Sequence, residues 1–510
     1  MLPSQNRRRF LQAAGTAGAF LGLDGLSTLT GLRAVSADEV HLDPKRVHLD
    51  SGIEPLVELI EVTPRERLVE EIAGRIRKGL TYREVLTSLF LAGVRNIRPR
   101  PNVGFKFHAV LVVNAAHLAS LAAPDTERWL PLFWSLDYFK VAQATNDHES
   151  GWKLGPVDEA KVPTARKARQ QFIEAMDNWD EAGADVAAAA LARTAGANEA
   201  FELFCKYGAR DFRDIGHKAI YVANGWRTLQ CIGWQHAEPV LRSLAYALLQ
   251  HEGDNPAKRD GEPDQPGRRN KGLASRLRPE WQEGKPSPEA TSDLLAVLRE
   301  GNSEAAADCV IKLLEGGAAV QSVWDALFAG AAELVIRQPG IPSLHAVTST
   351  NALRQAFEMS GDDETRRWLL LQNAAFLPLF RKFMGQRGHM GDGKIDALTT
   401  TPLKTAGPEA VGEIFKDVGP NSAAAASKML GYLAAKGDPG ALMDAARLLV
   451  FFKGNDAHDY KFSSAVLEDY GRVSQPWRDR YMAASAYLLR GASAKDSEVA
   501  KRTHAALKNG

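Results

Sequence analysis

Three polar side chains fall on one face of an otherwise apolar segment. His217, Tyr221 and Asn224 follow one another at spacings of four and three residues, which places them on one side of a helix. Ile220 and Val222 between them are apolar. A buried polar group without a hydrogen-bond partner costs about 1–3 kcal/mol. The stripe therefore indicates either one wall of a ligand pocket or a hydrogen-bond network between helices.

A histidine and a carboxylate stand close together at the entrance of the next predicted helix. His236 and Glu238 are two residues apart, and Pro239 suits the first turn of a helix. Imidazole and carboxylate groups are both metal ligands, and they also combine as a base with its orienting acid. The alternative interpretation is a helix cap with a histidine on the surface.

Two further histidines lie among polar groups later in the chain. His345 precedes Thr348 and Ser349 by one helical turn, and His458 belongs to a cluster with Lys461. Neutral imidazoles with a carboxylate suit iron, copper or zinc, so iron or copper is a possible cofactor. The candidate metal ligands are His217, His236, Glu238 and His345. The candidate catalytic residues are His217, Tyr221, Asn224, His345, His458 and Lys461.

His108 and His117 lie in an apolar segment nearer the N-terminus. They are nine residues apart, so they point to opposite sides of a helix and cannot both face one pocket. His108 shares its face with apolar residues such as Leu111 and Ala115. Neither histidine is among the candidate site residues.

The composition and the missing motifs exclude several classes of protein. A net charge of +1 gives no electrostatic case for binding nucleic acid. Three cysteines in a chain of this size cannot form a disulfide framework. The chain has no phosphate-binding loop, no His-Glu-x-x-His zinc motif and no Gly-x-Ser-x-Gly nucleophile elbow. A small organic molecule is therefore the expected ligand.

Apolar residues at helical spacing, together with helix-start signals, predict an all-α protein. Thr63-Pro64-Arg65-Glu66 and Thr81-Tyr82-Arg83-Glu84 both read as capping boxes. A Pro- and Gly-rich stretch at 253–288 predicts a linker between an N-terminal helical domain (38–252) and a C-terminal one (289–510). The expected architecture is an irregular multi-helical array or bundle in two halves.

The first 37 residues have the pattern of an export signal. Arg7-Arg8-Arg9-Phe10-Leu11-Gln12 is close to the twin-arginine motif, and Val35-Ser36-Ala37 is a small-residue cleavage site. The apolar run between them is too short to span a bilayer, and none in the mature chain is long enough. We expect export to the periplasm or beyond the cell by the twin-arginine machinery, which carries folded proteins.

Three segments together resemble the questin oxidase-like family of helical proteins. These are Gly216-His217-x-x-Ile220, His345-Ala346-Val347-Thr348-Ser349 and His458-Asp459-Tyr460-Lys461. The resemblance implies an all-helical oxidoreductase with an aromatic or polycyclic substrate, and it places His217, His345, His458 and Lys461 near the site. A metal-dependent hydrolase or lyase and a non-enzymatic helical binding protein are the alternatives.

Overall fold

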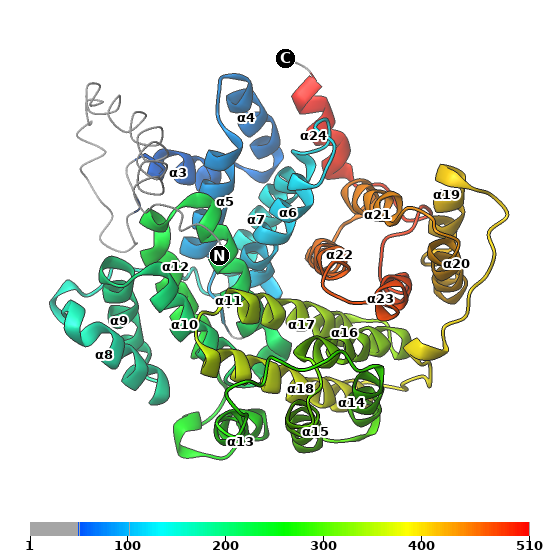
Figure 1. Cartoon of the computed structure of the whole chain (residues 1–510). Coiled ribbons are helices and arrows are strands. Elements are labelled where there is room, and N and C mark those ends of the chain that lie inside the picture. The colour runs from blue at the N-terminus through cyan, green and yellow to red at the C-terminus, as the bar shows by residue number, and fades with distance from the viewer. Residues whose placement is uncertain (1–48, 50–51, 101–102, 509–510) are drawn as a thin grey trace, which may run out of the picture.

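The computed structural model describes residues 49, 52–100 and 103–508 of the chain. Within these residues the protein consists of helices and contains no β-strand, as the all-α prediction requires (Figure 1). The segment 1–37, with its twin-arginine pattern, lies outside the described residues. No described helix is both long and apolar enough to cross a membrane.

The helices before the expected linker form the first group. They are α3 (Glu54–Val62), α4 (Arg65–Arg77), α5 (Tyr82–Asn96), α6 (His108–Leu121), α7 (Leu130–Glu149), α8 (Ala165–Asp177), α9 (Glu181–Thr194), α10 (Ala197–Gly208), α11 (His217–Ile232) and α12 (Ala237–Leu248). Two short 3₁₀ helices, η1 (Phe105–Phe107) and η3 (Arg213–Gly216), lead directly into α6 and α11.

The helices after it form the second group. They are α14 (Pro288–Glu300), α15 (Ser303–Glu315), α16 (Val320–Arg337), α17 (Ile341–Met359), α18 (Asp363–Gly385), α19 (Gly407–Asp417), α20 (Ser422–Ala434), α21 (Pro439–Lys453), α22 (Ala457–Asp469), α23 (Trp477–Ser485) and α24 (Glu498–Lys508).

The two predicted capping boxes have different outcomes. At α5 the Thr81 side chain accepts from the backbone N–H of Glu84, and the Glu84 carboxylate accepts from that of Thr81, so this box forms. The box at Thr63 does not form, because α4 begins one residue later than expected, with Pro64 at its N-cap. Thr63 then lies outside the cap position, and α4 has no side-chain cap.

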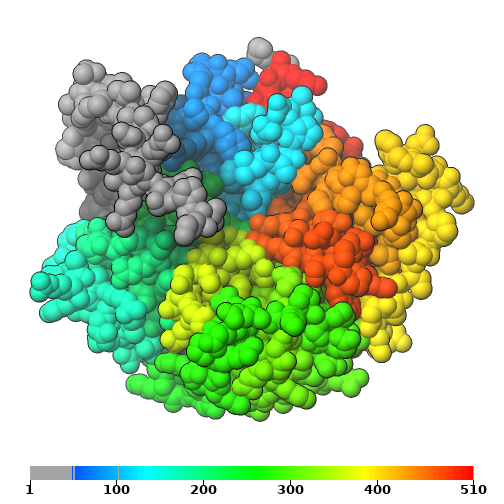
Figure 2. Space-filling view, in the orientation of Figure 1, coloured from blue at the N-terminus to red at the C-terminus, as the bar shows by residue number. Residues whose placement is uncertain are grey.

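The two groups of helices pack together through one continuous hydrophobic core. The segment 253–288 contains helix α13 (Gln265–Ala274), which lies against α18 and is fixed by a 2.8 Å hydrogen bond from Asn270 to Gln372. At the opposite side, the C-terminal α24 lies beside the N-terminal helices (Figure 2). It contacts α4, where Arg502 forms an ion pair with Glu70. The expected linker therefore joins halves that share an extensive interface.

Four helices meet where the two groups join. α6 packs against α11 and α22, and α17 packs against α11 and α22 as well. Helix α6 is apolar around almost its whole circumference, which requires cover from several sides. Two helices of the first group and two of the second thus surround one buried region.

Candidate functional site

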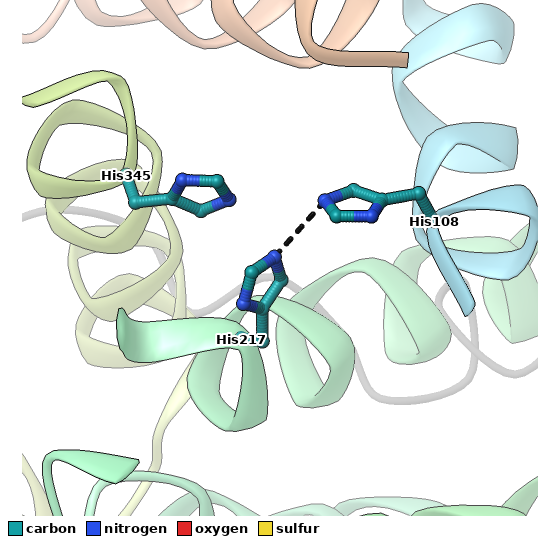
Figure 3. A group of neighbouring side chains, drawn as sticks. All are labelled: His108, His217 and His345. Atoms are coloured by element: carbon teal, nitrogen blue, oxygen red, sulfur yellow. Dashed lines mark hydrogen bonds between the residues drawn. The ribbon is translucent and has the colours of Figure 1, made fainter. Parts of the chain in front are cut away.

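Three histidines from three different helices meet in this buried region. His108 begins α6, His217 begins α11, and His345 lies in the first turns of α17 (Figure 3). One ring nitrogen of each lies within 4.8 Å of the others, and all three side chains are buried. The ring centres of His217 and His345 are 4.3 Å apart, and those of His108 and His217 are 4.9 Å apart.

Each of these histidines is held by a backbone carbonyl at its Nδ1 atom. His108 lies 2.6 Å from the carbonyl oxygen of Phe105, and His217 lies 2.6 Å from that of Asp214. His345 lies 2.7 Å from the carbonyl oxygen of Ile341. A carbonyl only accepts hydrogen bonds, so each Nδ1 must carry the proton. The Nε2 atom of each neutral ring is then left with a lone pair.

Two of these lone pairs face each other. The Nε2 atoms of His108 and His217 are 3.1 Å apart (Figure 3). Two unprotonated nitrogens repel at this distance unless a cation lies between them. Two nitrogens that each lie about 2.1 Å from one metal ion, at a right angle, are about 3 Å apart. The observed separation therefore fits two ligands of one metal ion.

A proton is a poor candidate for that cation. The pKa of His108, of His217 and of His345 lies well below its ordinary value, chiefly because burial disfavours a charged imidazolium. Nearby Lys461 and the neighbouring imidazoles lower these pKa values further. All three rings are therefore neutral near pH 7, which is the form that binds a metal.

A fourth histidine extends the group. The ring centre of His458 lies 4.5 Å from that of His108 and 5.1 Å from that of His345. Its Nδ1 is 2.5 Å from a carboxylate oxygen of Asp456, and this hydrogen bond lowers the pKa of Asp456. Its Nε2 is buried and has no hydrogen-bond partner among the described residues. A carboxylate that orients an imidazole is a typical outer-shell arrangement at metal sites.

A buried amine completes the set. The Lys461 Nζ atom lies 3.4 Å from Nε2 of His345, and burial lowers the pKa of this lysine to about 7. The side chain is only 3% exposed. The groups that converge here are therefore four imidazoles and one amine, and the carboxylates of Asp214 and Asp456 line the same cavity.

Two of the anchoring carbonyls belong to residues in an unusual backbone conformation. Phe105 has φ of 47° and Asp214 has φ of 55°, in the left-handed region that residues other than glycine rarely adopt. Each such residue costs about 1–3 kcal/mol. After Asp214 the chain stays left-handed through Gly216, where a Cβ atom would lie 2.6 Å from the Ser349 hydroxyl. These strained turns direct the carbonyls of Phe105 and Asp214 toward the Nδ1 atoms of His108 and His217, which lie three residues further along the chain.

A cavity of about 1020 Å³ opens onto these imidazoles. All four histidines line it, and aromatic side chains form much of its wall, namely Phe105, Tyr138, Phe212 and Phe383. Charged pairs such as Lys106 with Glu149 and Lys382 with Glu262 lie around it. A volume of this order accommodates an organic molecule of several rings.

The structure does not place the other predicted ligands in this site. His236 belongs to η4 (Trp234–His236), and its ring lies next to Gln235. The Glu238 carboxylate forms an ion pair with Arg193, which also binds Glu159. His236 and Glu238 are therefore not brought together with His217 and His345, because η4 lies at the far end of α11 from His217.

Two members of the predicted polar stripe have structural partners. The hydroxyl of Tyr221 donates to Ser243 at 3.0 Å, and its side chain is fully buried away from the cavity. The Asn224 amide donates to the carbonyl of Leu111 at 3.1 Å. Along this face of α11, only His217 reaches the cavity, and the following residues join α11 to its neighbours.

His108 is the site residue that sequence reasoning missed. Its apolar neighbours on α6 favoured a core position, but it stands at the first residue of the helix, beside the cavity. His108 and His217 share a feature that only the structure shows: each begins a helix three residues after the residue whose carbonyl holds its Nδ1 atom.

Comparison with known proteins adds no relative from which a role could be transferred. No family model, no curated protein and no solved structure matches the chain.

Proposed function

We propose that this protein is an exported, metal-dependent oxidoreductase that acts on an aromatic or polycyclic organic molecule bound in the histidine-lined cavity. The observation that carries the proposal is the pair of Nε2 lone pairs, on His108 and His217, that face each other at 3.1 Å. His345 and His458 supply two further nitrogens toward the same region.

The donor set favours a metal with a preference for nitrogen. Imidazole suits iron, copper and zinc, whereas calcium and magnesium require oxygen ligands. A bound iron or copper ion supplies activation of dioxygen at the cavity wall. The resemblance to the questin oxidase-like family supports oxidative chemistry, and the aromatic wall of the cavity supports a ring-bearing substrate.

The protein's own residues have distinct tasks in this proposal. The backbone carbonyls hold three imidazoles with Nε2 toward the centre, and Asp456 does the same for His458. The amine of Lys461, next to Nε2 of His345, can donate a hydrogen bond to a group bound there. The aromatic rings Tyr138 and Phe212 exclude water from the substrate and position it by stacking.

The first experiment is metal analysis with an absorption spectrum of the full chain purified after export. Stoichiometric iron or copper that is lost on His108→Ala and on His217→Ala supports the proposal. The matched control is His236→Ala, which removes a histidine that lies outside the cavity and should keep the metal. Zinc alone would favour the alternative function, a metal-dependent hydrolase or lyase, since zinc has no redox chemistry. Purified protein without bound metal would favour the other alternative, a non-enzymatic binding protein.

Export is tested separately. Arg7→Lys with Arg8→Lys changes the twin-arginine pattern and keeps its charge. We expect the variant to remain in the cytoplasm with its metal bound, because the twin-arginine route carries proteins that have already folded. Unchanged export of this variant would contradict the twin-arginine assignment and leave the metal centre unaffected.

A further inference from the structure

Three residues of the cavity wall also form hydrogen bonds with the histidines. Phe105, Asp214 and Ile341 all line the cavity, and the backbone carbonyl of each accepts the hydrogen bond from one histidine Nδ1. The residues that a bound molecule would touch are therefore also the residues that orient the imidazoles.

Two of these residues expose an apolar side chain to solvent. Phe105 is 72% exposed and Ile341 is 54% exposed, although large apolar side chains are usually buried. Val141, which is 38% exposed, lines the same cavity. Six large apolar side chains stand out as exposed among the described residues, and three of them surround this opening. We define Phe105, Val141 and Ile341 as the apolar rim.

The backbone conformation of Phe105 explains how one residue can both orient His108 and present a side chain to a bound molecule. Its left-handed conformation directs the carbonyl to His108 while the ring remains at the surface. An exposed aromatic ring and a left-handed non-glycine residue are both unfavourable by themselves. Their occurrence together next to a buried histidine points to a use for the exposed ring.

We infer that the apolar rim couples substrate binding to the metal centre: an apolar molecule that packs on Phe105 and Ile341 restrains their backbone carbonyls and thereby the imidazoles of His108 and His345. The inference rests on the proposed metal centre. Fixing these carbonyls lowers the mobility of the ligands, so a bound molecule strengthens metal binding, and the metal strengthens binding of that molecule by the same factor.

Val141 offers a matched control for this coupling. It belongs to the rim and lies within α7, but no histidine hydrogen bond to its carbonyl is found in the described structure. Loss of its side chain should weaken contact with a bound molecule without affecting the orientation of an imidazole. Phe105→Ala and Ile341→Ala remove the rim contact and keep the carbonyls that hold His108 and His345.

The test uses Co²⁺ as a spectroscopic metal and the uncharged fluorophore N-phenyl-1-naphthylamine as the apolar probe, both with the full chain. We expect saturating probe to tighten Co²⁺ binding by about fivefold or more and to shift the visible bands of the bound Co²⁺. Phe105→Ala and Ile341→Ala should still bind Co²⁺, while the coupling factor falls toward one. Val141→Ala should bind the probe more weakly and retain the coupling factor.

The possible failures are distinguishable. A chain that does not bind Co²⁺ contradicts the metal centre and, with it, the coupling. A chain that binds Co²⁺ but not the probe shows that the rim is no apolar binding surface. Binding of both with a coupling factor of one, or equal coupling in Phe105→Ala and Val141→Ala, overturns the inference and leaves the metal centre intact.

Discussion

Helices α6 and α11 pack against each other, and a cluster of polar side chains that contains a histidine of α6 lies near each end of their contact. At their first residues, His108 faces His217. Toward their other ends, the ring of His117 lies 3.2 Å from the sulfur of Cys231 and 3.0 Å from the hydroxyl of Tyr82. The same residue type thus occurs twice on one helix in two different environments.

The two environments differ in the groups that the imidazole nitrogens contact. Both nitrogens of His117 have neutral partners, a hydroxyl and a thiol, that can donate or accept a proton. The nitrogens of His108 and His217 that point away from their carbonyls meet each other instead. A buried histidine with two neutral partners is satisfied as it stands, whereas two facing lone pairs require a cation. Burial alone therefore does not identify a ligand histidine.

The largest expected effect separates the two clusters directly. His217→Ala should weaken binding of the native metal by more than about 100-fold, because removal of a ligand exceeds the effect of an outer-shell change. His117→Ala should leave the metal content unchanged. Metal analysis of both purified variants, with circular dichroism to confirm folding, checks this. Equal loss of metal from the two variants would remove the distinction between the clusters.

The next effect concerns the carboxylate that orients His458. Asp456→Asn should lower metal affinity by about 10- to 100-fold, because the amide no longer holds the Nδ1 proton of His458 as strongly. Asp459→Asn, in the same first turn of α22, is the matched control, since Asp459 accepts from backbone groups and from Arg490. Competition with a chelator measures both affinities. Metal binding that is unaffected in Asp456→Asn would contradict an outer-shell role for Asp456.

A smaller effect appears in the pH dependence of stability. Burial lowers the pKa of His117, so below about pH 6.5 the unfolded chain binds a proton that the folded protein does not. Stability is therefore lost as the pH falls through this range, by at most about 1.4 kcal/mol per pH unit from this residue. His117→Gln should reduce the slope. Urea unfolding at pH 6.5 and 5.5 measures how stability depends on pH in both proteins. An unchanged slope would show that His117 binds its proton equally well in the folded and the unfolded chain.

The smallest effect tests whether freeing a nitrogen is enough to create a metal ligand. Tyr82→Phe removes the partner of His117 Nδ1 and should lower the free energy of unfolding by about 1 kcal/mol. It should not add a second bound metal, because His117 belongs to no group of three or more potential metal ligands in the described structure. Thermal unfolding and metal analysis of the same sample check both parts. A second equivalent of metal would show that a single free nitrogen suffices.

Local chemistry explains how far the fold could be predicted. The 3.6-residue spacing of apolar side chains indicates helices without reference to their neighbours, and the capping box of α5 depends only on residues three apart. The box at Thr63 failed because the helix began one residue later, a shift that short-range patterns do not resolve. Domain separation was harder to judge, because a Pro- and Gly-rich composition does not show what the chain packs against.

The candidate site could be predicted only in part for a similar reason. His217, His345, His458 and Lys461 were each noticed for their polar character in apolar segments, and the structure brings them together. His108 was not among the candidate site residues because it shares its helix face with apolar residues, and nothing local distinguishes a core histidine from one at a cavity wall.

The amino-acid sequence alone determined the helices and supplied buried histidines at the starts of several of them, because periodicity and capping act between near neighbours. The packing of α6, α11, α17 and α22 determined which histidines meet, since His108 and His217 are separated by 109 residues along the chain. Packing also determined their tautomers, because the strained turns at Phe105 and Asp214 place carbonyls at Nδ1 and leave Nε2 toward the centre.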